Sequence, residues 1–181
     1  MKPALVVIIL CSAALAQGNK NPVSTVLRDA LPGRQKNTVA AIEEMPADKF
    51  NYKPTPEQMT FGELAAHITQ GNYFFCSNVG DVARPKDETD LKGTEGKEKL
   101  VAAVKASFEF CDSALAKADD AKLGDNIEWF DHKPRPRAAA FLGLASSWAD
   151  HYGIAAMYLR LNGLMPPSAQ RAKTSEEPTK K

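Results

Sequence analysis

The chain has 181 residues, the size of one domain with a sizeable hydrophobic core. Its 23 Lys and Arg residues almost balance its 22 Asp and Glu residues, so the charge gives no indication of binding to nucleic acid or to an anionic membrane surface. After the N-terminal stretch, no apolar segment is long enough to cross a bilayer.

The N-terminal segment has the three parts of a secretory signal peptide. Lys2 gives the positive start, an apolar run continues to Leu10, and Ala14 and Ala16 supply the small residues of a cleavage site. We therefore predict that residues 1–16 are removed on export. The mature protein is then expected in the periplasm or outside the cell.

Apolar residues at helical spacing predict four helices, and strand-like alternation is nearly absent. The first expected helix covers residues 22–45, and the Pro32-Gly33 pair inside it should kink or split it. The second begins at the sequence TFGE. There Thr60 and Glu63 have the spacing of a capping box, which is a specific signal for the start of a helix.

The third expected helix covers residues 97–118 and the fourth covers residues 138–161. The sequence NG ends the fourth helix, and the prolines that follow should prevent it from resuming. We predict an all-α four-helix bundle over residues 17–167, followed by a disordered tail at 168–181. All three connections are long, so an up-down-up-down order is not required.

Two cysteines remain after the predicted cleavage site, Cys76 and Cys111. An even pair in an oxidising compartment favours a disulfide. The alternative is two small, buried thiols on neighbouring helices. Because we expect export, we predict the disulfide.

Two histidines are the candidates for metal binding, because side chains from facing helices can build a metal site inside a bundle. His67 in the second helix and His151 in the fourth each lie among apolar residues. A catalytic divalent metal usually takes three protein ligands, and the third is open here. Glu63 lies one turn before His67, and Ser147 lies one turn before His151. Asp150 could orient a histidine or could simply be solvated.

Several aromatic side chains recur at helical spacing, and most of them are expected in the core. Tyr73 and Tyr158 lie off the main apolar stripe, so we predict that they line a pocket. The basic residues Lys133, Arg135 and Arg137 are interleaved with prolines before the fourth helix. This cluster is too short for nucleic-acid recognition and is expected to be a solvated loop.

Two stretches resemble the DinB-like family of small helical bundles: MPADKFNYKPTPEQMTFGELAAHITQGNYF and, far downstream, WADHYGIAAMYLRLNGLMPP. The resemblance covers nearly the whole chain after the predicted signal peptide. It implies a four-helix bundle in which three histidines typically bind a divalent metal, often nickel or zinc. Characterised relatives are thiol-dependent transferases and isomerases of the cytoplasm, which is not where this chain is expected.

The family's metal ligands map only partly onto this sequence. One histidine matches His67, and the second histidine of an H-x-x-x-H pair matches His151. The first member of that pair falls at Ser147, and Ile154 replaces the glutamine that often follows HYG. The resemblance therefore implies a degenerate site that binds zinc or nickel weakly or not at all.

Three functions remain open from the sequence. The leading prediction is a domain that binds a small molecule or a weakly held metal, without established catalysis. The first alternative is a metal-dependent transferase or hydrolase that uses His67 and His151. The second alternative is a scaffold for a partner protein, including a homodimer. Bound metal would separate the first two, and an exposed apolar patch or an interface would support the third.

Overall fold

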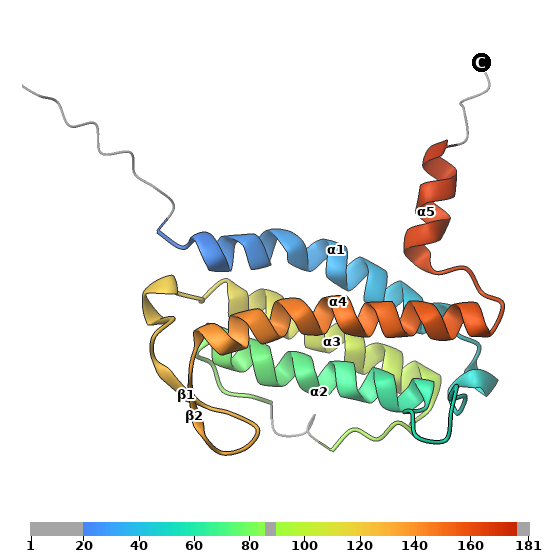
Figure 1. Ribbon diagram of the computed structural model, residues 1–181, viewed down its shortest axis with the longest axis horizontal. Coiled ribbons are helices and arrows are strands. Elements are labelled where there is room, and N and C mark those ends of the chain that lie inside the picture. Colours follow the sequence, from blue (N-terminus) through green and yellow to red (C-terminus); the bar gives the residue numbers. More distant parts are fainter. Residues whose placement is uncertain (1–19, 86–89, 177–181) are drawn as a thin grey trace, which may run out of the picture.

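The computed structural model describes residues 20–85 and 90–176, so the predicted signal peptide at 1–16 lies outside the described residues. Four long helices form a bundle (Figure 1), which confirms the predicted all-α four-helix fold. They are α1 (Pro22–Glu44), α2 (Phe61–Gly80), α3 (Lys97–Leu115) and α4 (Ala138–Leu161). In this part of the chain, no helix is both long enough and apolar enough to cross a membrane.

The order of the helices is up-down-down-up, because α2 and α3 are parallel. Contacts between the two helices follow the same order along both of them. The Asn72 side chain donates to Ser107 Oγ at 2.9 Å, and one turn further along each helix Cys76 is bonded to Cys111. The predicted disulfide is thus confirmed, with the two Cα atoms 5.1 Å apart. The connection from α2 to α3 returns along the bundle so that both helices start at the same end (Figure 1).

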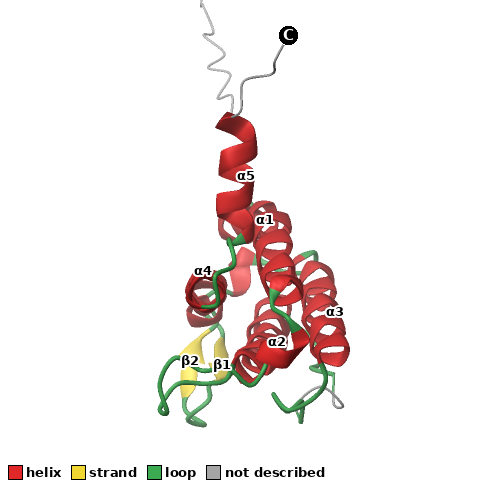
Figure 2. Ribbon diagram, turned by 90° about the vertical axis from the view of Figure 1, so that its right-hand side faces the viewer, coloured by secondary structure: helices red, strands yellow, loops and turns green. Residues whose placement is uncertain are grey.

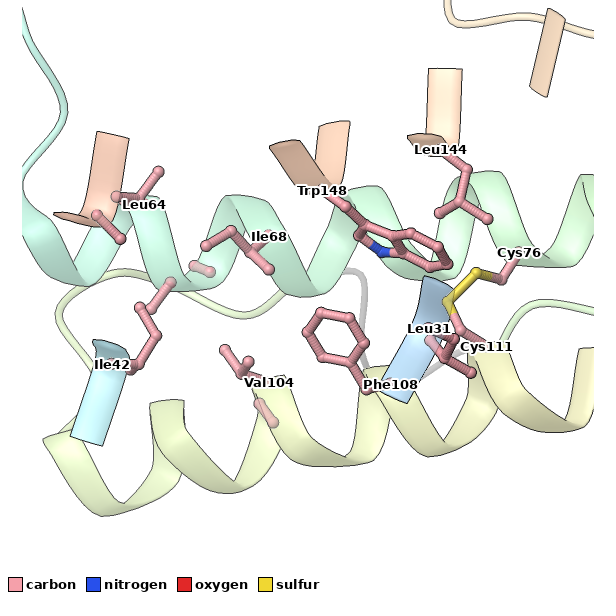
Figure 3. Packing of buried hydrophobic residues seen from close by; sticks show 14 of the residues in the cluster. Leu31, Ile42, Leu64, Ile68, Cys76, Val104, Phe108, Cys111, Leu144 and Trp148 are labelled. Carbon is pink, nitrogen blue, oxygen red and sulfur yellow. A yellow bond between two sulfur atoms is a disulfide. The ribbon is translucent and has the colours of Figure 1, made fainter. Parts of the chain in front are cut away.

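The core lies between the four helices and contains side chains from all of them. Figure 3 shows part of it, with the disulfide near one end and these labelled residues packed along the helices: Leu31, Ile42, Leu64, Ile68, Val104, Phe108, Leu144 and Trp148. Polar side chains are also buried in the core, among them Asn72 and Ser107. Asn72 accepts a hydrogen bond from the Trp148 indole at 3.0 Å, so the burial of its amide is compensated.

Helix α1 continues through Pro32, so Pro32-Gly33 does not split the helix, which was one of the two predicted outcomes. Both residues are exposed. The backbone group left without an intrahelical bond can therefore be solvated. The N-terminus of α1 is tied down by Asp120, whose carboxylate accepts from the backbone N–H of Val23 at 2.6 Å and of Ser24 at 3.0 Å.

The predicted capping box at the start of α2 is present. Thr60 Oγ1 accepts from the Glu63 backbone N–H at 3.1 Å, and Glu63 Oε2 accepts from the Thr60 backbone N–H at 2.7 Å. The bond from the Thr60 backbone lowers the pKa of Glu63. The Glu63 carboxylate is therefore ionised and already engaged at the helix end.

A small hairpin stands in the connection before α4, where we expected only a loop. It consists of β1 (Asn126–Glu128) and β2 (Pro134–Pro136), which are antiparallel. The expectation that Arg137 is solvated was also wrong. The residue is only 6% exposed, and its guanidinium donates to the Asn78 carbonyl and, at 3.2 Å, to the Asp81 carboxylate. These bonds fasten the hairpin connection to the end of α2.

The C-terminal region also differs from the prediction. A fifth helix, α5 (Pro167–Glu176), starts where a disordered tail was expected, and Figure 2 shows it projecting away from the bundle. The second proline of the PP pair is the first residue of α5, a position at which proline favours a helix rather than stopping it. The rest of the predicted tail, residues 177–181, lies outside the described residues.

Candidate ligand pocket and histidine pair

A cavity of about 430 Å³ lies between α2 and α4 and is completed by Arg84, after α2, and by Phe130, between the hairpin strands. Helix α2 contributes its residues His67, Gln70, Gly71, Tyr73, Phe74 and Phe75. Helix α4 contributes Gly143, Ser146, Ser147, Asp150 and His151. The volume of the cavity falls within the usual range for small-molecule sites, roughly 300–1,000 Å³.

The antiparallel register of α2 and α4 divides the cavity into a polar end and an aromatic end. His67 faces His151 at the polar end, and one turn along Gly71 lies opposite Ser147. Another turn along, the Phe75 ring lies against Gly143. A Cβ atom on residue 143 would overlap this ring. Glycine at position 143 therefore allows the aromatic end to form.

The two imidazole rings of the polar end pack edge to face, with ring centroids 4.8 Å apart and planes at 79°. His151 Nδ1 is hydrogen-bonded to Ser147 Oγ at 3.0 Å, so its Nε2 atom is left for another contact. His67 is exposed and His151 is half-buried. The rings are close enough for both to reach one ion bound between them.

Burial is the main reason why the pKa of His151 is lower than the ordinary value for histidine, and the neighbouring His67 lowers it further. Asp150 and the hydrogen bond at Ser147 act in the opposite direction. Asp150 itself is exposed at the cavity and influences His151 through its charge. His151 is therefore neutral near pH 7, which is the form that binds a metal.

A third strong ligand is not found next to the pair. Within residues 20–85 and 90–176, no group of three or more His, Cys, Asp or Glu side chains could hold a metal ion. Glu63 is one turn from His67, but its carboxylate caps α2 at Thr60. His132 is exposed in the hairpin turn and bonds Glu128 at 2.5 Å. The site thus provides two imidazoles and the weak hydroxyl ligand of Ser147.

The aromatic end is built around Phe74. The ring of Phe130 stacks on it with centroids 3.7 Å apart, the Trp129 ring lies 5.5 Å away, and the Arg84 guanidinium lies 5.0 Å from its centroid. Phe130 remains 58% exposed, so it covers the entrance rather than joining the core. This end offers an apolar surface with one cation beside it.

The two tyrosines predicted for a pocket have different positions. Tyr73 lines the cavity, although only 4% of it is exposed and its ring packs on Phe110. Tyr158 does not line the cavity: it is 2% exposed and donates a hydrogen bond to the Met59 carbonyl at 2.7 Å. Its aromatic ring fills the core, and the bond to Met59 satisfies the hydroxyl.

Arg84 and Phe130 are pocket residues that the sequence reasoning missed. Phe130 had a weak signal, because Trp129 and Phe130 form an aromatic pair inside an otherwise polar loop. Arg84 had none, since it follows α2 outside any periodic pattern. Only the folded arrangement brings both residues to Phe74.

Fold and site together define a class of protein: a four-helix bundle with histidines of its second and fourth helices facing each other in a cavity. The sequence profile of the DinB superfamily matches residues 30–155, which is more than half of the chain. The chain therefore belongs to the DinB superfamily.

Solved structures with the same fold agree with this assignment. A DinB-like protein from Bacillus cereus ATCC 10987 superposes with a TM-score of 0.61 at 15% identity, covering 77% of this chain and 92% of its own. A DinB-like protein from Bacillus subtilis gives a TM-score of 0.59 at 19% identity, covering 79% and 93% respectively. No curated protein matches the sequence.

Proposed function

We propose that this protein binds a small molecule in the cavity between α2 and α4, beside a weak divalent-metal site formed by His67 and His151. The observation that carries this proposal is the pair of imidazoles, 4.8 Å apart, at one end of a cavity of about 430 Å³. We further propose that the protein works after export. The Cys76–Cys111 disulfide supports an oxidising compartment.

Zinc or nickel suits the residues that are present. Both ions accept imidazole ligands, and the lowered pKa of His151 reduces competition from protons. Two imidazoles hold an ion less firmly than the three protein ligands usual at a catalytic zinc site. Binding in the micromolar range or weaker is therefore expected.

Binding is favoured over catalysis by a metal-dependent transferase or hydrolase. Such an enzyme would need His67 and His151 to hold the metal firmly while a coordination position stays open for water or substrate. Among the described residues, no third His, Cys, Asp or Glu side chain supports the pair in this role.

Titration calorimetry of the untagged mature protein with zinc and with nickel tests the proposal. Saturable binding of one ion is expected, and the variants His67→Ala and His151→Ala should each abolish it. His132→Ala is the matched control, because His132 bonds Glu128 in the hairpin turn and does not line the cavity. Failure of the unmodified protein to bind either ion, or an equal loss in His132→Ala, would contradict the metal site.

Replacing Ser147 by histidine should strengthen the site. Ser147 Oγ already lies 3.0 Å from His151 Nδ1, so a histidine at this position would bring a third imidazole to the pair. We expect zinc or nickel to bind at least about tenfold more tightly, because ligand type and number set the affinity. An unchanged affinity would mean that the two helices do not bring these side chains to a common ion.

A further inference from the structure

The aromatic end of the cavity carries a guanidinium, that of Arg84, which has no ion-pair partner within the described residues. By contrast, the nearby Arg137 and Arg135 are paired with Asp81 and Asp131. Partial burial lowers the pKa of Arg84 but leaves the side chain charged at neutral pH. Arg84 is therefore an exposed cation at the edge of the cavity, beside aromatic side chains, where an anionic group of a ligand could pair with it.

The way Arg84 is held leaves its hydrogen-bonding groups available. Its guanidinium carbon lies over the Phe74 ring, 5.0 Å from the ring centroid. Such a cation–π contact involves the ring face and uses none of the N–H donors as hydrogen bonds. A fork of parallel N–H donors matches the two oxygens of a carboxylate.

The aromatic side chains next to Arg84 indicate the chemical character of the remainder of the ligand. The rings of Tyr73, Phe74, Phe75 and Phe130 line this part of the cavity, so a flat or apolar body would be buried against aromatic surface. Asp150 adds one negative charge to the lining and therefore disfavours a highly charged anion. A single negative charge on the ligand therefore fits better than a doubly charged phosphate, which would also have to lose a larger hydration shell.

We propose that the cavity binds a small monocarboxylic acid with an aromatic or apolar body, whose carboxylate pairs with Arg84 and whose body lies against Phe74 and Phe130. This inference rests on the proposed ligand pocket and names the class of its ligand. The carboxylate contact lies at Phe74, away from His67 and His151. Binding of the acid therefore requires no metal ion.

The test uses hydrocinnamate as probe and hydrocinnamyl alcohol, which has the same ring and chain without the charge, as the matched neutral compound. Binding to the mature protein is measured by calorimetry in the presence of a chelator. We expect the acid to bind about tenfold or more tightly than the alcohol, as a charge-assisted pair would produce. Equal affinities, or no binding of the acid, would overturn the proposal.

Two variants assign the contacts. Arg84→Gln should remove the preference for the acid, while Arg160→Gln, which changes an exposed arginine in the last turn of α4 that does not line the cavity, should leave it unchanged. Phe130→Ala changes an exposed ring and should weaken both compounds alike. A preference for the acid that survives in Arg84→Gln would overturn the proposal.

The same measurement separates this proposal from the metal site. The double variant His67→Ala/His151→Ala, which should lose zinc and nickel, is expected to bind hydrocinnamate as the unmodified protein does. Loss of acid binding in this variant would place the ligand at the histidine pair instead of at Arg84 and would overturn the inference. Loss of metal binding with acid binding retained supports it.

Discussion

Helix α2 packs against two neighbours in different ways. We call its tightly packed interface with α3 the closed seam and its interface with α4, which contains the cavity, the open seam. In the closed seam the backbones touch: a Cβ atom at Gly80 would overlap the carbonyl group of Ala114, and a disulfide joins the helices one turn earlier. In the open seam, a Cβ atom at Gly71 would meet only Ser147 Oγ, at 3.8 Å. The cavity with the histidine pair lies on this open side.

The comparison shows how a bundle can keep a cavity between two of its helices. Covalent and backbone contacts hold α2 against α3, so the position of α2 does not depend on filling the space toward α4. Arg84, which forms no ion pair within residues 20–85 and 90–176, and the half-buried His151 both lie on the open side. Four predictions test this division, from the largest expected effect to the smallest.

The disulfide should contribute most to the closed seam. Cys76 and Cys111 are 35 residues apart, and opening a loop of this length should lower the free energy of unfolding by roughly 3–4 kcal/mol. The measurement is the melting temperature of the protein with and without reductant, repeated for the double variant Cys76→Ala/Cys111→Ala. Equal midpoints under oxidising and reducing conditions would contradict this role.

The backbone contact at Gly80 should have the next largest effect. In Gly80→Ala the new methyl group must push α3 away from α2, at a cost of about 1–3 kcal/mol in unfolding free energy. Gly33→Ala is the matched control, because a Cβ at Gly33 has no atom within 4 Å, so the change should stabilise α1 by about 0.5–1 kcal/mol. Urea unfolding of both variants gives the comparison, and a neutral Gly80→Ala would mean that the closed seam tolerates separation.

The open seam should be the pH-sensitive one. The folded pKa of His151 lies below its unfolded value, so the unfolded chain binds its proton first as the pH falls. The stability that the neutral ring contributes is therefore complete above the ordinary histidine pKa and is lost as the pH drops through the folded value.

This loss of stability is expected to be smaller than the effects of changes in the closed seam, because His151 is only half-buried. Urea unfolding across this range should show a shallower dependence on pH for His151→Gln than for the unmodified protein. His132→Gln, which changes an exposed histidine, should keep the original dependence. A dependence that His151→Gln leaves intact would assign it to other groups.

Helix α5 belongs to neither seam and should matter least. Beyond Ser168 its side chains bond at the surface: Gln170 donates to the Met165 carbonyl at 2.7 Å, and Arg171 donates to Asn37. A chain that ends at Ser168 should unfold within about 0.5 kcal/mol of the full chain, because such exposed pairs contribute little. A loss well above this value would show that α5 packs on the bundle.

The features predicted correctly from the sequence depend on local signals. Thr60 and Glu63 start α2 because a capping box needs only four residues, and the resemblance places His67 and His151 on facing helices. The hairpin was missed because its strands have only three residues each, too few to show alternation. The proline pair before α5 was misinterpreted because proline can follow one helix and begin the next.

The parts of the site that were missed depend on the path of the chain. The parallel order of α2 and α3 is set by a long connection whose route no local pattern determines. Arg84 and Phe130 both contact the Phe74 ring, although they are 46 residues apart in the sequence. Neither residue belongs to a helix, so no helical pattern of apolar residues points to it. Such residues become visible as a site only after the helices are packed.

The disulfide between the parallel helices also makes the stretch from Cys76 to Cys111 a closed covalent ring, which contains the whole return connection and Arg84. A protease that cuts the backbone once inside this ring would leave both fragments attached to each other through the sulfur bond. The nicked protein would keep the mass of an intact chain in a non-reducing gel, apart from one added water, and would separate into two pieces only after reduction. That tether would keep the aromatic end of the cavity joined to the rest of the bundle after a first cleavage.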